Sequence, residues 1–176
     1  MPIYTEKFKN LVLYILANEH YKDEGIKKLN KVLYFVDFYF YRDHERLISG
    51  VTYAKAPMGP IVNDYQTIFK QMVQDDVLHQ KSEYPAMFTS NIDYTLSEFS
   101  PEEVDHIHKV LEKYGRLSST ELEAISHQQQ PWVLTERMGD IIDPDLALLI
   151  ADDSGEELEI TDENLKNELE RLANSA

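Results

Sequence analysis

The sequence predicts a mainly α-helical (α+β) domain that carries a small antiparallel β-sheet of about three short strands. Three observations lead to this fold class. Apolar residues recur at helical spacing over residues 8–16 and 26–40. Ser100 and Ser118 are each followed three residues later by glutamate, which is the capping signature of a helix start. Between the helical regions, short runs of β-branched and aromatic residues are typical of strands.

Two helices are expected in the first forty residues. Thr5 and Glu6 supply the start of the first helix, which should end near Asn18. The second carries the widest apolar stripe of the chain, from Ile26 to Phe40, and such a wide stripe indicates a helix packed on several sides. This second helix is therefore the predicted centre of the core.

An acidic residue interrupts the aromatic part of that helix. Asp37 lies between Tyr34 and Phe40, and a carboxylate buried there without a partner would have a raised pKa. We interpret Asp37 as facing solvent or pairing with a lysine or tyrosine, and a functional role is the alternative. The lysines that precede it are interpreted as the solvated face of the helix: Lys27, Lys28 and Lys31.

The segment VTYAKAPMGPIVNDY, residues 51–65, is predicted to form a strand, a tight turn and a new helix start. Tyr53 lies in an alternating run that suits a short strand. Pro57 fits the second position of a turn and Gly59 the fourth. Pro60 fits the first position of a helix, where its missing N–H is not needed. The segment is therefore expected to be a strand-to-helix junction.

The second half of the chain contains a predicted hairpin and several helix starts. Residues 87–89 and 92–96 are expected to be paired strands, and this hairpin should join the strand near residue 53. A helix should run from Pro101 to Gly115. Further helix starts are expected at Ser118, Pro131 and Pro144.

Length and charge bound the organisation of the chain. Its 176 residues, 43% of them hydrophobic, suit one globular domain over residues 1–151. Residues 152–176 hold nine acidic residues against two basic ones, and leucines at 165, 169 and 172 predict that this extension is partly helical. The net charge of −15 argues against a nucleic-acid partner and favours a basic protein.

The sequence also restricts compartment and chemistry. The chain has no cysteine, which excludes disulfides and thiol catalysis and fits a reducing compartment. It shows neither an export signal nor an apolar run long enough to cross a bilayer. A cytoplasmic protein with no membrane partner is therefore expected. Phosphate-binding loops and the common hydrolase motifs are lacking, so we expect no enzyme activity and no cofactor.

A single E-x-x-H motif runs from Glu103 to His106. Paired copies of this motif build di-iron sites, but the sequence holds one copy, and a solvated helix face is the favoured interpretation. His108 is two residues from His106 and does not share its helix face. A metal-dependent hydrolase that uses Glu103, His106 and His127 remains an alternative.

Three segments, in order, carry a family resemblance. They are KLNKVLYFVD at residues 28–37, ISGVTY leading to PMGPIV at residues 48–62, and Ser126-His127 followed by Pro131-Trp132. Together they resemble the Panacea domain of SocA-like antitoxins, which also occurs in GepA-like phage-associated proteins. The resemblance extends from Phe8 to Ile150.

The resemblance implies an antitoxin that neutralises a cognate protein toxin, encoded in the neighbouring gene, by direct binding. The positions that match the family pattern are Lys31, Tyr34, Asp37, Gly50, Tyr53, Pro57, Gly59, Pro60, Tyr65, His127 and Trp132. Met58 departs from the pattern, because a bulkier or aromatic residue is expected there. As an adaptable side chain at a turn tip, Met58 suits a binding surface, and we expect Lys55 to join it. Trp132 is expected in the core, and Tyr53 either in the core or at the interface.

Two further alternatives remain open. In the SocA case the antitoxin is a proteolytic adaptor, so the resemblance also implies that the chain could deliver a toxin to a ClpXP-type protease through its acidic extension. The extension and the acidic domain could instead mimic nucleic acid and occupy a DNA-binding protein.

Overall fold

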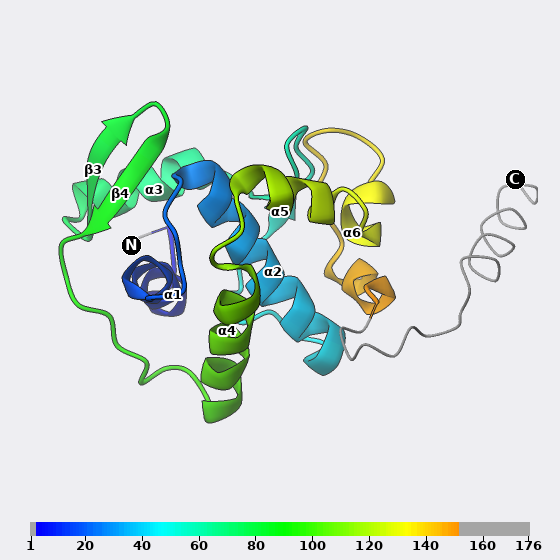
Figure 1. Ribbon diagram of the computed structural model, residues 1–176, viewed down its shortest axis with the longest axis horizontal. Coiled ribbons are helices and arrows are strands. Elements are labelled where there is room, and N and C mark those ends of the chain that lie inside the picture. The colour runs from blue at the N-terminus through cyan, green and yellow to red at the C-terminus, as the bar shows by residue number, and fades with distance from the viewer. Residues whose placement is uncertain (1–2, 152–176) are drawn as a thin grey trace, which may run out of the picture.

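The computed structural model describes residues 3–151 (Figure 1). The helices are α1 (Glu6–Ala17), α2 (Ile26–His44), α3 (Tyr65–Gln74), α4 (Pro101–Tyr114), α5 (Ser119–Ser126), α6 (Gln130–Val133) and the 3-10 helix η1 (Pro144–Leu149). The strands are β1 (Tyr53–Ala54), β2 (Ile61–Val62), β3 (Leu78–Glu83) and β4 (Ala86–Ser90). They form two separate two-stranded antiparallel sheets, β1–β2 and β3–β4. The predicted class, mainly α with a small antiparallel β component, is confirmed.

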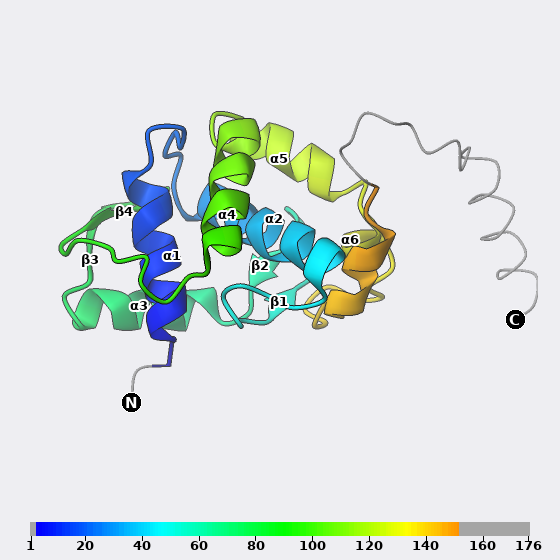
Figure 2. The same ribbon diagram turned by 90° about the horizontal axis from the view of Figure 1, so that it is seen from below.

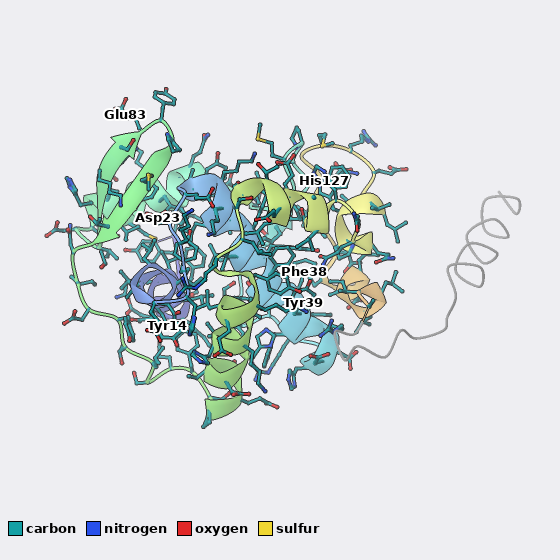
Figure 3. All side chains as sticks on the ribbon, viewed as in Figure 1. Tyr14, Asp23, Phe38, Tyr39, Glu83 and His127 are labelled. Atoms are coloured by element: carbon teal, nitrogen blue, oxygen red, sulfur yellow. The ribbon has the colours of Figure 1, made fainter. Side chains whose placement is uncertain are left out.

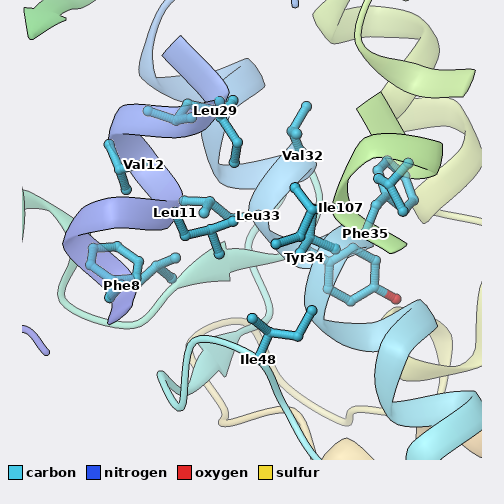
Figure 4. Packing of buried hydrophobic residues seen from close by; sticks show 14 of the residues in the cluster. Phe8, Leu11, Val12, Leu29, Val32, Leu33, Tyr34, Phe35, Ile48 and Ile107 are labelled. Atoms are coloured by element: carbon cyan, nitrogen blue, oxygen red, sulfur yellow. The ribbon is translucent and has the colours of Figure 1, made fainter. Parts of the chain in front are cut away.

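Helix α2 is the centre of the core, as its wide apolar stripe predicts. Every residue from Lys28 to Phe40 is buried. Helices α1, α4 and α5 pack around α2, and α3 and the β3–β4 sheet lie next to α1 at one end of the molecule (Figures 1 and 2). In Figure 4, Phe8 of α1, Ile107 of α4 and Ile48 of the loop after α2 meet the apolar face of α2.

The predicted helix starts are confirmed at three serine or threonine caps. The backbone N–H of Phe8 donates to Thr5 Oγ1 at 3.0 Å. Ser100 and Ser118 each form a complete capping box with the glutamate three residues on. Local hydrogen bonding therefore fixes these boundaries, which is why they could be read from the sequence.

The prediction that Lys27, Lys28 and Lys31 form a solvated face is wrong for two of the three. Lys28 and Lys31 are 0% and 1% exposed. Lys28 donates to the carbonyl oxygens of Lys22 and Gly115, and Lys27 forms a 2.9 Å ion pair with Glu123. Backbone carbonyls at the ends of neighbouring segments thus provide buried partners for an ammonium group, which a helical pattern does not reveal.

The predicted hairpin forms with a different partner strand. Residues 87–89 do lie in β4, but the partner strand is β3, which precedes it, and residues 92–96 form no strand. The turn contains Tyr84 and Pro85, joined by a cis peptide bond. Only the first residue of β3 is buried, so this strand lacks the apolar alternation that marks a strand in sequence. The hairpin also does not pair with β1.

The predicted strand-to-helix junction is a second hairpin. Pro60 leads into β2, which pairs with β1, and α3 begins only at Tyr65. On its other side β1 contacts residues 139–142: Lys55 N–H donates to the Asp140 carbonyl at 2.9 Å, and Ala54 forms an isolated antiparallel bridge with Ile141. Both edges of β1 are therefore occupied.

Two further sequence predictions concern membrane-spanning helices and the C-terminal extension. Among the helices of residues 3–151, none has the length and apolar character needed to cross a membrane. The extension 152–176, with its leucine spacing, lies outside the described residues.

Candidate functional site

The β1–β2 hairpin is attached to α2 by the residues that carry the family resemblance. The Tyr53 hydroxyl donates to Asp37 Oδ2 at 2.6 Å, and the Tyr53 ring packs edge-on against Tyr34 at a centroid distance of 6.0 Å. The Val62 N–H donates to Asn30 Oδ1 at 2.9 Å. Because these contacts are buried, they hold the hairpin in one position on the central helix. Tyr53, at 1% exposure, is a core residue rather than an interface anchor.

Asp37 organises the segment between α2 and the hairpin. It is fully buried and accepts hydrogen bonds from the N–H groups of Ile48 and Ser49 at 2.8 and 2.9 Å, and from the hydroxyls of Ser49 and Tyr53. Burial raises the pKa of Asp37, and the four hydrogen bonds oppose that rise. The predicted pairing with a tyrosine is confirmed, and the solvent-facing alternative is wrong.

A stack of three side chains joins the hairpin to α5 and α6. Lys55 Nζ lies 4.3 Å from the centroid of the Trp132 ring, and the rings of Trp132 and His127 stack at 4.1 Å. Trp132 Nε1 donates to the Ala56 carbonyl at 2.9 Å. Figure 3 shows His127 at the end of α5, where the chain turns into α6. The predicted core role of Trp132 is confirmed in part, since the indole is half-buried.

Lys55 is not the exposed contact residue that we expected. It is 8% exposed, and its Nζ donates to the Thr135 carbonyl at 2.8 Å. The alternation of a strand places Lys55 on the face that meets Trp132, where the carbonyl and the ring satisfy the cation. The local sequence around Lys55 could not predict Thr135 as its partner, because the two residues are eighty positions apart.

The turn at the hairpin tip has the predicted form. Gly59 N–H donates to the Ala56 carbonyl at 3.1 Å, which places Pro57 second and Gly59 fourth. Gly59 has a φ of 107°, and a Cβ there would lie 2.7 Å from Ser126 Oγ. Only glycine fits, because a side chain would meet both backbone strain and α5. Met58 projects from this turn and is 54% exposed.

Burial divides the predicted site residues into three groups. Pro57 and Met58 are exposed. The half-buried residues are Tyr65, His127 and Trp132, and the buried ones are Lys31, Tyr34, Asp37, Tyr53, Lys55, Gly59 and Pro60. Most of the family-motif positions therefore build the scaffold beneath a surface rather than the surface itself.

Lys31 is buried below the hairpin turn, and burial lowers its pKa to about 8, with the nearby Lys27 acting in the same direction and Glu123 opposing. The unfolded chain binds more protons than the folded chain between about pH 8 and 10.5, so this lysine makes the protein less stable at neutral pH. We expect Lys31→Met to raise the free energy of unfolding at pH 7 by about 1 to 3 kcal/mol. The gain should shrink as the pH rises to 10, as measured by urea unfolding of both proteins. A gain that does not change with pH would contradict the buried charge as its cause.

The sequence did not predict the most apolar part of the surface. Among residues 3–151, seven of the eleven strongly exposed large apolar side chains lie on the hairpin tip, α6, the segment after it and η1: Met58, Val133, Leu134, Met138, Ile141, Leu148 and Leu149. We call these seven residues the α6–η1 surface. Helix α6 and η1 lie side by side at one end of α2 (Figures 1 and 2).

The α6–η1 surface is also acidic. Glu136, Asp140, Asp143 and Asp145 are all exposed in the same segment, whereas Arg137 is its single basic residue between positions 133 and 149. Asp145 accepts a hydrogen bond from Tyr41, which with partial burial raises the pKa of Tyr41 to about 12. Apolar side chains among carboxylates suit a partner that is both apolar and basic.

The residues of the alternative function, a metal-dependent hydrolase, do not form a site. Glu103 accepts hydrogen bonds from Lys7 at 2.8 Å and from Arg46; burial would raise the pKa of Glu103, but these cations and Ser100 N–H hold it below its usual value. His106 Nε2 lies 2.8 Å from the Val36 carbonyl, and His127 stacks on Trp132. Within the described part of the chain, the group with metal-binding geometry contains none of the three.

Comparison with known proteins identifies the family of the chain. Residues 29–133 match the family model described as antitoxin SocA-like, Panacea domain. No curated protein and no solved structure shows a significant match to the chain. The matched residues run from the start of the central helix to the end of α6 and so include Asp37, the β1–β2 hairpin and the stack on Trp132. Since they make up more than half of the chain, the protein belongs to the SocA-like antitoxin family with a Panacea domain.

Proposed function

We propose that this protein is a non-enzymatic antitoxin that neutralises a cognate protein toxin by binding it directly through the α6–η1 surface. Family membership supports the antitoxin role. The observation that carries the proposed surface is the gathering of exposed apolar side chains around α6 and η1. Exposed apolar groups that gather in one region, rather than scatter singly, mark sites of protein interaction.

The scaffold beneath this surface supports a pre-formed binding site. Met58 is presented by a turn that is fixed by Gly59, and the Asp140 carbonyl of the segment after α6 accepts a hydrogen bond from the N–H of Lys55, the residue after β1. Little conformational entropy is then lost when a partner binds, so more of the contact energy appears as affinity.

Charge supports a basic toxin as the partner. The whole chain has a net charge of −15, and four exposed acids lie among the apolar residues of the α6–η1 surface. Complementary charge increases the association rate and disfavours acidic partners. Binding should therefore weaken with added salt, mainly through slower association.

Co-expression with the product of the neighbouring gene tests the proposed role. The neighbour should arrest growth when expressed alone, and this chain should restore growth and co-purify with it in a stable complex. A harmless neighbour that does not bind would contradict the antitoxin role. Deleting residues 152–176 separates blocking from delivery to a protease: rescue should persist if binding alone neutralises, and should fail with toxin accumulation if the extension is needed for proteolysis.

Substitutions at two exposed methionines test the surface itself. We expect Met58→Asp combined with Met138→Asp to weaken toxin binding by about tenfold or more, because two apolar contacts are replaced by charges at the interface. The melting temperature should change little, since both side chains are more than half exposed. Tyr84→Asp is the matched control, because Tyr84 is 93% exposed on the β3–β4 turn. Equal binding by all three proteins, measured by calorimetry, would exclude the α6–η1 surface while leaving the antitoxin role intact.

A further inference from the structure

We propose that His20, His108 and Glu112 form a binding site for a divalent transition-metal ion, with zinc as the ion to test. His108 and Glu112 are one turn apart on α4, and His20 comes from the loop between α1 and α2. One ligand atom from each residue can be chosen such that all three lie within 4.8 Å of one another. None of these residues belongs to the α6–η1 surface, so the site is independent of the proposed toxin contact.

The distances suit a small metal ion. His108 Nε2 and Glu112 Oε1 are 3.3 Å apart, and His20 Nε2 is 4.0 Å from the same oxygen. Two ligands of a tetrahedral zinc ion are about 3.3 Å apart when each bond is about 2.0–2.1 Å. The pair on α4 is thus already at coordination distance, and a bound ion would draw His20 Nε2 closer to the Glu112 carboxylate than 4.0 Å. Two imidazoles and one carboxylate are also a donor set that zinc enzymes use, with the fourth position left open.

The backbone around His20 is held in place. Its N–H donates to Asn18 Oδ1 at 2.9 Å, and the N–H of Lys22 donates to the Gly115 carbonyl at 2.9 Å. Gly115 follows α4 directly, three residues after Glu112, and its Cα lies so close to the His20 carbonyl that a Cβ would overlap that oxygen. The loop is therefore fixed to the end of α4 that carries Glu112. The ligands are brought together by the fold and not by the ion, which favours binding.

The partial exposure of the three side chains keeps them accessible. The side chains of His20, His108 and Glu112 are 26%, 44% and 51% exposed. A hydrated ion can therefore reach them without opening the core. Glu19 Oε1 lies 3.7 Å from His20 Nε2 and adds negative charge beside the site. A bound ion would link the α1–α2 loop to α4 and would stabilise the folded chain by mass action.

Calorimetric titration with zinc chloride tests the site in the full, untagged chain after dialysis against a chelator and then against chelator-free neutral buffer. We expect one equivalent to bind and the melting temperature to rise with zinc concentration. His20→Ala and His108→Ala should each weaken binding by about tenfold or more and abolish the rise in melting temperature. His79→Ala is the matched control, since His79 is exposed on β3, away from the site.

A second pair of variants separates coordination from general attraction to an acidic chain. Glu112→Gln should weaken zinc binding, whereas Glu98→Gln, which removes the same charge elsewhere, should not. Without zinc, all variants should melt within a few degrees of the wild type, because these side chains are at least partly exposed. Loss of binding in the site variants alone would support the proposal. No binding to the wild type, or equal binding by the site variants and their controls, would overturn it.

Discussion

Replacing Asp37 with alanine is expected to lower the free energy of unfolding by about 3 to 5 kcal/mol, which is a large part of the total stability of a typical domain. The substitution would leave the N–H groups of Ile48 and Ser49 and the hydroxyl of Tyr53 without their acceptor. Each buried group left unpaired costs about 1 to 3 kcal/mol. The β1–β2 hairpin would lose its hydrogen bonds to Asp37 of α2, so the effect should extend to the proposed binding surface.

Asp37→Asn distinguishes the loss of hydrogen-bond acceptors from the loss of the negative charge. The amide keeps an oxygen that can accept from the two backbone N–H groups, while the hydroxyls of Ser49 and Tyr53 must turn to accept from its nitrogen. We expect a loss of about 1 to 2 kcal/mol, clearly smaller than that of alanine. Urea unfolding followed by circular dichroism and by the fluorescence of Trp132, the single tryptophan, measures both. Equal losses for Asn and Ala would show that charge, and not hydrogen bonding, makes Asp37 necessary.

The parts of the fold that the sequence predicted are those decided locally. Caps at Thr5, Ser100 and Ser118 act over three residues, and the apolar stripe of α2 repeats over several turns. The β1–β2 hairpin was missed because its strands are two residues long and their pairing depends on Asn30, a side chain of α2. A pattern within residues 51–65 cannot contain that information, and Pro60 fits a helix start equally well.

The candidate site was predictable in part for a similar reason. The family was recognised from its motif. Tyr53 and Lys55, however, resemble interface residues and are buried by partners that lie far away in sequence. The apolar residues of 133–149 have the composition of core, and no periodicity within the segment shows that neighbouring elements leave them exposed. Exposure depends on how α6 and η1 meet, which is a tertiary property.

The division between scaffold and surface bears on partner choice. The family match ends at residue 133, so Leu134, Met138, Ile141, Leu148 and Leu149 of the α6–η1 surface lie beyond it. The matched residues hold the hairpin and the stack on Trp132 in place. A shared scaffold with a contact surface outside the shared region would allow related chains to bind different toxins, since exposed residues can change with little effect on stability.

Gly115→Ala is the second substitution with a large expected effect. It should destabilise the protein, although replacing glycine by alanine at an ordinary φ usually stabilises a protein. The φ and ψ of Gly115 are −62° and −26°, which any residue adopts. Alanine lowers the conformational entropy of the unfolded chain, and this effect alone would stabilise the protein by about 0.4–1 kcal/mol. However, the added Cβ would overlap the carbonyl oxygens of His20 and Leu111, which are backbone atoms and cannot rotate away. The α1–α2 loop would have to separate from the end of α4.

That separation would remove the partners of a buried charge. The Gly115 carbonyl accepts from Lys22 N–H at 2.9 Å and from Lys28 Nζ at 2.7 Å, and Lys28 is 0% exposed. We therefore expect a net loss of about 3 kcal/mol or more, since a buried ion that loses a partner is strongly destabilising. Gly139→Ala is the control: Gly139 has a φ of 92° but no atom within 4 Å of its added Cβ, so backbone strain alone should cost about 1–2 kcal/mol. Gly115→Ala should thus lower the free energy of unfolding more than Gly139→Ala. The opposite order in urea unfolding would mean that the α1–α2 loop moves without cost and that His20 is not held against α4.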